Sequence, residues 1–267
     1  MLESIAVNPQ VEIQFARMEV ARAGLSSMLV IALLLKVISC QSDLECLKEF
    51  KSSIRDPMHF LDSWIFPPTF SICKFAGIYC FHEDEVVYKI DLPGLGLTGG
   101  FPRGLDKCSN LAFLDLSHNK LNGTIPSNIC GIPYLISFDV HNNSFSGSVE
   151  TSFNNCTFLN NLNLSHNRFS GPIPGQIGVL PRLTKFDVSF NQFTGTIPSS
   201  FTSFGRNFSS RSFASNPGLC GGPLRKLCYT KCSGRTRSWL AETIRSSSFI
   251  FIFSSMSRLH HHSGHMI

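Results

Sequence analysis

A period of 24 residues runs through the middle of this chain and constrains its fold more than any other feature. Four leucines mark the period: Leu111, Leu135, Leu159 and Leu183. Asparagines and glycines repeat in the same register, at Asn119, Asn143, Asn167, Asn191, Gly123, Gly147, Gly171 and Gly195. Self-similarity at a fixed period predicts a stack of like units, in which each unit contacts mainly its neighbours.

Each unit carries apolar residues in the pattern L-x-x-L-x-L-x-x-N-x-L, which is the leucine-rich-repeat signature. One unit shows the pattern at Leu159, Leu162, Leu164, Asn167 and Phe169. A degenerate first unit fits the same register through Ile90, Leu92, Leu97, Gly99 and Pro102. Leu95 stands at the asparagine position of that first unit. The sequence therefore predicts five repeats.

Elementary physics turns this pattern into a fold. The L-x-L portion predicts a short strand whose leucines point inward while the residues between them face solvent. A single repeat cannot bury its apolar side alone, so neighbours stack around one continuous core. The asparagine amide has both donors and an acceptor, and can satisfy backbone groups in the turn that leaves each strand. We expect an α/β solenoid with parallel strands on its inner face, irregular and 3-10 segments on its outer face, and disulfide-capped ends.

The N-terminus has the order of regions found in a signal peptide. Arg17 and Arg22 precede an apolar run over residues 28–35, and the small residues Ser39 and Cys40 follow it. This run is much shorter than the ~20 apolar residues that span a bilayer. Residues 1–40 are therefore predicted to be an extension with a signal peptide, and the chain is expected to be secreted. No later segment is apolar for long enough to predict a membrane span.

Cysteines form two pairs that are close in sequence near the ends of the repeats, Cys73 with Cys80 and Cys220 with Cys228. In an exported chain such pairs predict disulfides. The six and seven intervening residues fit a zinc site poorly, because zinc ligands usually come in pairs separated by two to four residues.

The other cysteines in and beside the repeats have a plainer interpretation. Cys108 and Cys156 fall at a position that is apolar in the other repeats, which predicts small buried hydrophobic residues. Cys130 falls at a different position within its repeat and is expected to be exposed. The sequence assigns no partner to Cys46, Cys108, Cys130, Cys156 or Cys232.

The charge distribution argues against nucleic acid as a partner. The formal net charge is +5, but residues 41–205 hold 11 Lys and Arg against 14 Asp and Glu, a net charge of −3. Residues 206–267 hold nine basic residues against one acidic residue, a net charge of +8. Because the excess basicity belongs to a tail, the repeats lack the basic face with aromatic stacking platforms that nucleic-acid binding needs.

Motifs that could indicate catalysis have structural explanations. Residues 94–99 match G-x-G-x-x-G, but Gly99 lies in the glycine register of the repeats and no helix is predicted after it. Ser117-His118 and Ser165-His166 come directly before the repeating asparagines, on the expected solvent face, and no oxyanion hole is evident beside them. Histidines in the tail, at residues 260–265, could hold a metal only weakly. We expect no enzyme activity, no cofactor and no metal site.

Family resemblance appears in the residues that follow each strand and in both flanks. Gly-x-Ile-Pro at 123–126, 171–174 and 195–198 resembles plant-specific leucine-rich repeats. Residues 44–50, Asp56-Pro57, Trp64 and the first cysteine pair resemble the plant N-terminal cap. Residues 216–224 resemble the cap that closes plant receptor-kinase ectodomains. Val149-Glu150 replaces Ile-Pro in the third repeat, so the backbone there is less well defined by the pattern.

Five repeats, with Cys46-Leu47-Lys48 and Cys73-Lys74-Phe75 in the cap, most resemble the small receptor-like pseudokinases that sequester somatic-embryogenesis-type co-receptors. The resemblance implies a cap at 41–82, repeats at 83–205, a second cap at 206–232, and a basic Ser- and His-rich tail at 233–267 that is expected to be disordered. It implies an extracellular, apoplastic negative regulator or soluble decoy that binds another receptor ectodomain. The membrane helix and kinase-like domain of those single-pass relatives have no counterpart in this sequence.

Two alternatives remain. Polygalacturonase inhibitors, which act on secreted cell-wall-degrading enzymes, share this repeat type but have about twice as many repeats. A truncated, non-functional receptor-like kinase fragment is the other.

Outward strand positions supply the candidate contacts with a partner. The predicted partner-binding residues are Lys89, Asp91, Phe113, Asp115, Asp139, Lys185, Asp187 and Phe190. Among them Phe113 and Phe190 are predicted to be exposed aromatic anchors. Asp91, Asp115, Asp139 and Asp187 form an acidic column, interrupted at Asn163, which can also be interpreted as a solvated face without a partner. Five strands span only ~20 Å. A sheet this narrow offers less area than the ~800 Å² that a standard interface buries on each partner. A partner is therefore expected to contact a cap or an edge as well.

Five sequons are candidate glycosylation sites: Asn122, Asn142, Asn155, Asn163 and Asn207. Asn163 lies between two core leucines on a strand that faces the expected ligand.

Overall fold

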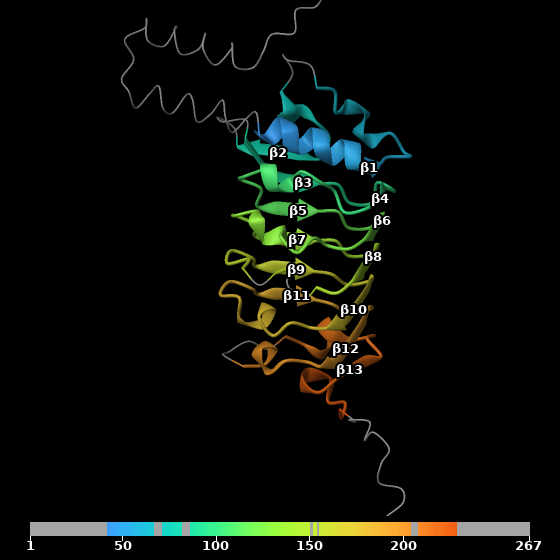
Figure 1. Cartoon of the computed structure of the whole chain (residues 1–267), viewed down its shortest axis with the longest axis vertical. Coiled ribbons are helices and arrows are strands. Elements are labelled where there is room, and N and C mark those ends of the chain that lie inside the picture. Colours follow the sequence, from blue (N-terminus) through green and yellow to red (C-terminus); the bar gives the residue numbers. More distant parts are fainter. Residues whose placement is uncertain are drawn as a thin grey trace, which may run out of the picture. The chain divides into compact units, whose positions relative to one another are not determined.

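Two sheets and a series of 3-10 turns form the fold in a computed structural model of the chain (Figure 1). The structure describes residues 42–66, 71–81, 86–149, 152–153, 155–203 and 208–228. The predicted signal peptide, the predicted basic tail, Cys232 and Asn207 lie outside these residues. Among the residues that are described, no helix is both long and apolar enough to cross a membrane.

The first sheet contains one strand from each repeat. The strands β3 (Val86–Asp91), β5 (Phe113–Asp115), β7 (Ser137–Asp139), β9 (Asn161–Asn163) and β11 (Lys185–Asp187) pair in parallel. Their central residues are in register and buried: Ile90, Leu114, Phe138, Leu162 and Phe186. The solvent-facing side of this sheet is the inner face that the sequence predicted.

A sixth strand extends this sheet into the N-terminal cap. Strand β2 (Ile78–Phe81) pairs antiparallel with β3, with a register shift between Tyr79 and Cys80. The sequence predicted only the five repeat strands, because β2 lies in the cap and outside the 24-residue register. In the described part of the chain, the inner face is therefore one strand wider than predicted.

A second sheet lines another side of the repeats. It runs in the order β1 (Ile54–Arg55), β4 (Thr98–Gly99), β6 (Lys120–Gly123), β8 (Ser144–Gly147), β10 (Arg168–Pro172), β12 (Gln192–Thr196) and β13 (Gly218–Cys220). The sequence did not predict this second sheet, although the 3-10 segments that it did predict are present. The 3-10 turns follow these strands and are η3 (Leu105–Lys107), η4 (Ile129–Gly131), η5 (Ile177–Val179) and η6 (Ser199–Phe201).

The repeating asparagines form a ladder between the sheets. The amide of Asn167 accepts a hydrogen bond from the Phe145 N–H at 3.0 Å and donates to the carbonyl oxygens of Val140, Leu164 and Ser165. The other ladder residues repeat this pattern, and Asn119 also covers the degenerate repeat by accepting from the Leu95 and Leu97 N–H groups. Beside the ladder, the buried rings of Phe145, Phe169 and Phe193 stack at 6.2–6.4 Å.

The N-terminal cap closes the core with a helix and a tryptophan. The described part of the helix covers residues 42–53 and buries Leu47 and Phe50. Trp64 is 1 % exposed, stacks on Phe75, and donates its indole N–H to the Ala76 carbonyl at 3.0 Å. Two further turns of the cap are η1 (Phe60–Ser63) and η2 (Ile72–Lys74).

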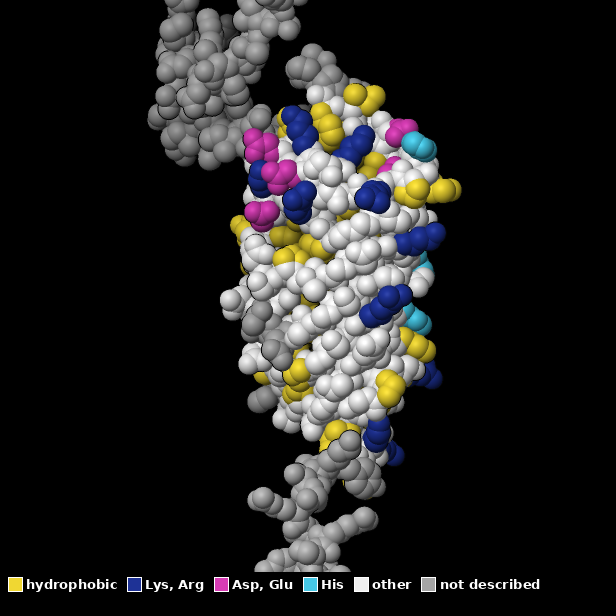
Figure 2. Space-filling model, turned by 45° about the vertical axis from the view of Figure 1, so that its right-hand side comes forward, with side chains coloured by type: hydrophobic (Ala, Val, Ile, Leu, Met, Phe, Trp, Pro, Cys, Tyr) yellow, Lys and Arg dark blue, Asp and Glu magenta, His cyan; other side chains and the backbone are white. Residues whose placement is uncertain are grey.

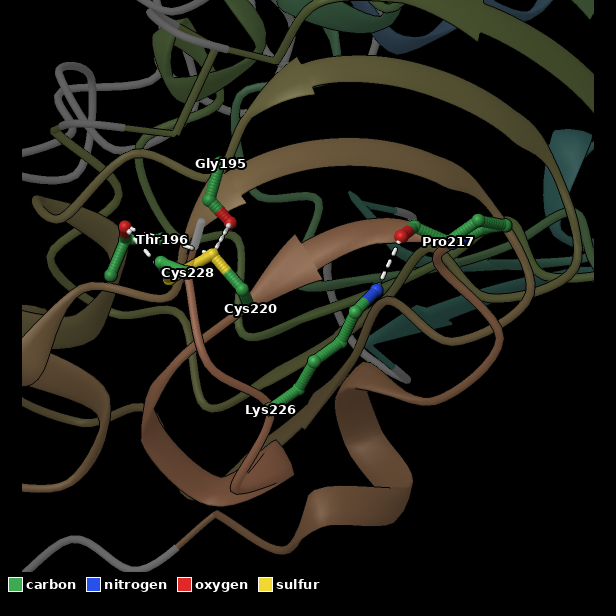
Figure 3. Close-up of a disulfide and its surroundings, with 6 residues drawn as sticks. All are labelled: Gly195, Thr196, Pro217, Cys220, Lys226 and Cys228. Carbon is green, nitrogen blue, oxygen red and sulfur yellow. Dashed lines mark hydrogen bonds between the residues drawn. A yellow bond between two sulfur atoms is a disulfide. The ribbon is translucent and has the colours of Figure 1, made fainter. Parts of the chain in front are cut away.

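The C-terminal cap contains η7 (Ser210–Phe213), β13 and η8 (Gly222–Leu224). Figure 3 shows its disulfide, Cys220–Cys228, next to Thr196 of the last repeat, whose hydroxyl lies 3.3 Å from the Cys228 sulfur. Lys226 donates to the Pro217 carbonyl at 2.6 Å and ties the end of the cap to its beginning. The structure also joins the other predicted pair, Cys73–Cys80.

Two more disulfides correct the interpretation of the remaining cysteines. Cys108 is bonded to Cys46, and Cys156 is bonded to Cys130. Cys108 and Cys156 are buried as predicted, but they are not unpaired, and Cys130 is only partly exposed. The second bond joins consecutive repeats, whose stacking brings the Cα atoms of Cys130 and Cys156 to 4.9 Å despite 26 residues of separation.

Candidate partner-binding face

An aromatic cluster occupies the N-terminal end of the inner face. It consists of Tyr79 and Phe81 on β2, Tyr88 on β3 and Phe113 on β5. The ring of Tyr88 lies 4.8 Å from that of Phe81 and 6.4 Å from that of Phe113. Tyr79 and Phe81 are 46 % and 53 % exposed, whereas Phe113 is half-buried against Tyr88. The sequence predicted an exposed Phe113 on the inner face; the residue does lie on that face, but Tyr88 covers part of its ring.

Lys89 lies between this aromatic cluster and the acidic column and contacts both. Its ammonium lies 5.0 Å from the centre of the Tyr79 ring and 2.8 Å from a carboxylate oxygen of Asp91. The hydrogen bond to Asp91 raises the pKa of Lys89 above its ordinary value. Lys89 is the register partner of Phe113, so the cation, the aromatic cluster and the adjoining carboxylates form one continuous surface.

The acidic column serves the turns as well as the surface. Asp115, Asp139 and Asp187 each accept a hydrogen bond from the backbone N–H two residues later, at 2.8–3.0 Å, and Asn163 does the same at 3.2 Å. Such bonds are Asx turns, which stabilise the chain as it leaves each strand. Asp139 also contacts the His141 ring at 2.7 Å. Among the described residues, Asp115 and Asp187 have no ion-pair partner, so they are the carboxylates of the column that remain available to a ligand.

A ridge of left-handed residues borders the inner face. It consists of His118, Asn142, His166, Phe190 and Ser215, which have φ values of 53–55° and are exposed. Each precedes an asparagine of the ladder. We call this row the left-handed ridge. Asparagine and histidine adopt this conformation more readily than most residues, whereas a bulky aromatic does so at a cost.

Phe190 is the ridge residue for which the left-handed backbone is energetically least favourable. It is 50 % exposed and stacks on His166, with ring centres 4.1 Å apart. His118 lies edge-on to His141, with Nε2 atoms 2.8 Å apart, and its Nδ1 lies 2.7 Å from the Asn142 amide nitrogen. The sequence identified Phe190 as an anchor candidate but missed the ridge, because the left-handed backbone becomes evident only when all the repeats are aligned in space.

Lys185 and the end of β11 border a polar hollow of about 340 Å³. Its walls include Asn161, Asn163, Asp187 and the cap residue Ser212. The predicted contacts at this end of the inner face therefore lie around a depression, whereas those at the other end lie on the aromatic cluster.

The motifs that suggested catalysis are parts of the repeat scaffold. Ser117 and Ser165 are 2 % and 4 % exposed, so the prediction that both members of each Ser-His pair face solvent is wrong for the serines. Gly94, Gly96 and Gly99 have positive φ values, and residues 99–104 contain no helix. In the part of the chain that the structure describes, no group of three His, Cys, Asp or Glu side chains could hold a metal ion. The tail histidines lie outside these residues.

Family models match both the cap and the repeats. The leucine-rich-repeat N-terminal domain matches residues 40–81, and the leucine-rich repeat matches residues 110–132, 158–180 and 182–204. Among curated proteins of Arabidopsis thaliana, a probably inactive leucine-rich-repeat receptor-like protein kinase is 41 % identical over 100 residues, covering 36 % of this chain and 16 % of the relative. The inactive receptor-like kinase BIR2 is 41 % identical over 101 residues, covering 36 % and 17 %. The chain therefore matches about a sixth of the length of these relatives.

Solved structures from Arabidopsis thaliana agree with these matches over a larger part of the chain. The BIR2 ectodomain is 40 % identical with a TM-score of 0.66, covering 70 % of this chain and 98 % of that structure. A chain of the BIR3–SERK2 complex is also 40 % identical, with a TM-score of 0.65 and coverage of 69 % and 98 %. The similarity therefore extends across nearly the whole of both ectodomain chains.

Proposed function

Because the chain belongs to the plant leucine-rich-repeat receptor-kinase family, with an ectodomain of the BIR2 type, we propose that it binds the ectodomain of a SERK-type co-receptor outside the cell. The chain is a receptor-type protein-binding module by its fold. The specific partner rests on the BIR3–SERK2 complex, in which a similar chain is assembled with a co-receptor. The relatives described as inactive kinases support a role without catalysis.

The observation that carries the proposal is the aromatic cluster beside Lys89 and Asp115. Protein interfaces concentrate their binding energy in a few aromatic and basic anchors that become desolvated on binding. Tyr79, Phe81 and Phe113 offer apolar area at one end of the inner face. The Lys89–Asp91 pair and Asp115 give this area a polar border, as in interfaces with an apolar centre and a polar rim.

Interface size favours a contact that includes the cap. Six strands span about 24 Å at a spacing of ~4.8 Å, and a standard interface buries ~800 Å² on each partner. Strand β2 makes the cap continuous with the inner face, and the left-handed ridge extends the surface sideways at Phe190. A partner ectodomain that lies across the aromatic cluster and along the ridge would reach the required area.

The biological role that we propose is negative regulation. A chain that occupies the co-receptor surface would withhold the co-receptor from signalling receptors, as a negative regulator or as a soluble decoy. We further propose that the chain enters the secretory pathway, and that residues 41–232, which include both caps and the five repeats, suffice to form the folded body.

Competition tests the proposed role. The full chain, secreted from plant cells, is titrated into a SERK2 ectodomain, and the complex is then challenged with a ligand-bound receptor ectodomain that recruits SERK2. We expect direct binding and displacement of the receptor. Binding without displacement would contradict the regulatory role, and the absence of binding would contradict the choice of partner.

A further inference from the structure

Asn122 lies on β6, the third of the seven strands of the second sheet, on a face that differs chemically from the inner face. Its side chain is exposed on β6, where Asn122 is the register partner of Ser144 on β8. None of the seven strands of the second sheet contains Asp or Glu. In Figure 2, which turns this side forward, the acidic side chains in view lie near the N-terminal cap and the lower part of the face is mostly neutral.

Hydroxyl groups dominate the outward positions of this face. They belong to Thr98, Thr124, Ser144, Ser146, Ser148, Ser170, Thr194 and Thr196. A hydroxyl donates one hydrogen bond and accepts others, so it can pair with another hydroxyl in either sense. The face lacks the large aromatic anchors that the inner face has, and its chemistry matches a polyhydroxylated ligand better than an apolar protein surface.

A hollow opens beside the two residues that follow Asn122. It has a volume of about 420 Å³ and is lined by Gly100, Phe101, Arg103, Thr124, Ile129 and Ile132, among others. Gly100 occupies the register position that holds Thr124, Ser148, Pro172 and Thr196 in the other repeats. A Cβ atom at Gly100 would meet nothing within 4 Å, so the missing side chain leaves open space there. Apolar walls with a polar rim suit the mixed surface of a sugar ring.

The amide of Asn122 is itself available for modification. Asn122-Gly123-Thr124 is a sequon, and within the described residues the Asn122 side chain makes no hydrogen bond. Asn163 differs, because its amide nitrogen donates to Asp139 at 3.2 Å and its oxygen accepts from the Ser165 hydroxyl at 2.8 Å. A sugar on the Asn163 nitrogen would stand on the inner face, in the surface proposed to meet the partner.

We propose that Asn122 carries an N-linked glycan whose first sugars lie over the hydroxyl face and the adjoining hollow, and that Asn163 stays unmodified. The glycan covers the second sheet and leaves the inner face as the free protein-binding surface. The inference rests on the proposed passage through the secretory pathway, but it does not depend on the identity of the co-receptor.

Glycopeptide mass spectrometry of the full chain secreted from plant cells tests the attachment. We expect the Asn122 peptide to carry a glycan and the Asn163 peptide to carry none. N122Q should migrate faster on a denaturing gel than the wild type. N163Q should migrate at the same position as the wild type. Secreted chain with a bare Asn122, or with a glycan on Asn163, would overturn the assignment. Because occupancy is read without any co-receptor, failed co-receptor binding leaves this result unaffected.

Hydrogen exchange tests the position of the glycan. Amide exchange is compared between glycosylated wild type and two variants that lose the sequon by different changes, N122Q and T124A. We expect exchange in residues 100–106 and 124–132 to be several-fold faster in both variants, with no change in residues 177–188. Equal exchange in wild type and both variants would overturn the seating of the sugars in the hollow.

Discussion

Asn216 donates a hydrogen bond of 2.9 Å from its side-chain amide to the carbonyl oxygen of Val188, 28 residues earlier in the chain. Asn191 makes the equivalent bond to Leu164 at the same distance. A residue of the C-terminal cap therefore continues the asparagine ladder beyond the last repeat. The cap both covers the end of the apolar core and satisfies the backbone groups that a sixth repeat would otherwise satisfy.

Replacing this asparagine should destabilise the fold. Asn216→Ala removes the side-chain acceptor of the buried Phe193 N–H and the hydrogen bonds that Asn216 donates to the Phe213 and Val188 carbonyls, of which Val188 keeps, among the described residues, only the bond from Asn191. We expect a loss of about 3 kcal/mol in the free energy of unfolding, measured by denaturant titration. Gln192→Ala, at an exposed position of β12, is the control and should change stability by less than about 0.5 kcal/mol. Equal effects of the two substitutions would contradict the role of the ladder in the cap.

A buried carboxyl should make the N-terminal cap sensitive to pH. Asp43 is 0 % exposed, and one carboxyl oxygen accepts from the Val87 N–H at 2.8 Å while the other has no hydrogen-bond partner among the residues that the structure describes. Burial raises the pKa of Asp43 to about 6, above its ordinary value near 4. Because the folded state binds the proton more tightly than the unfolded state, Asp43 favours folding most below its unfolded pKa.

The contribution of Asp43 should therefore decrease as the pH rises from about 4 to above 6, by up to about 3 kcal/mol. The free energy of unfolding is measured by denaturant titration at several pH values for the wild type and for Asp43→Asn. We expect the value for the wild type minus the value for the variant to decrease over this interval. The difference isolates Asp43 from the other titrating groups. A difference that is constant with pH would show that Asp43 does not titrate there.

The four disulfides between described residues should contribute unequally to stability. Cross-links that close longer loops remove more entropy from the unfolded chain. The Cys46–Cys108 bond spans 62 residues and the Cys73–Cys80 bond spans seven. Loop entropy predicts losses of about 4 and about 2 kcal/mol when each pair is replaced by alanine. Non-reducing peptide mapping should first verify the pairings, and a larger loss for the short loop would contradict this ranking.

We expect Phe190 to lower the stability of the fold while it increases the affinity for the co-receptor. Its left-handed backbone is unfavourable for a bulky aromatic residue, and asparagine, which occupies the same ridge position at Asn142, tolerates it better. We expect Phe190→Asn to leave the melting temperature unchanged or higher while weakening co-receptor binding several-fold. Calorimetric melting and titration measure the two effects separately. A lower melting temperature with unchanged affinity would show that the ring serves the fold, through His166, and not the partner.

The repeat pattern predicted the scaffold well because each constraint recurs every 24 residues. The buried centres of β5, β7, β9 and β11 follow directly from it. Features outside the register could not be derived in this way. Strand β2 and Tyr79 belong to a cap with no internal repetition, and the Cys46–Cys108 bond joins residues that no spacing rule connects.

The second sheet and the partial burial of Phe113 were missed for a different physical reason. Short polar stretches such as Ser144–Gly147 have little strand propensity of their own, and pair because the stacked repeats hold them in register. Phe113 was placed on the inner face correctly, but its burial depends on Tyr88, whose orientation is set by the hairpin of β2 and β3.

Isothermal titration of the full chain with a SERK2 ectodomain tests the central claim most directly. Wild type is compared with Phe113→Ala, with Asp115→Lys and with Tyr134→Ala, a control aromatic that is 50 % exposed and lies outside the strands of the inner face. We expect Phe113→Ala to weaken binding by about 2 kcal/mol, a factor of about 30. Tyr134→Ala should bind as wild type, and a parallel kinetic binding assay should show that Asp115→Lys slows association in a salt-dependent way. Wild-type affinity in both inner-face variants would contradict the account.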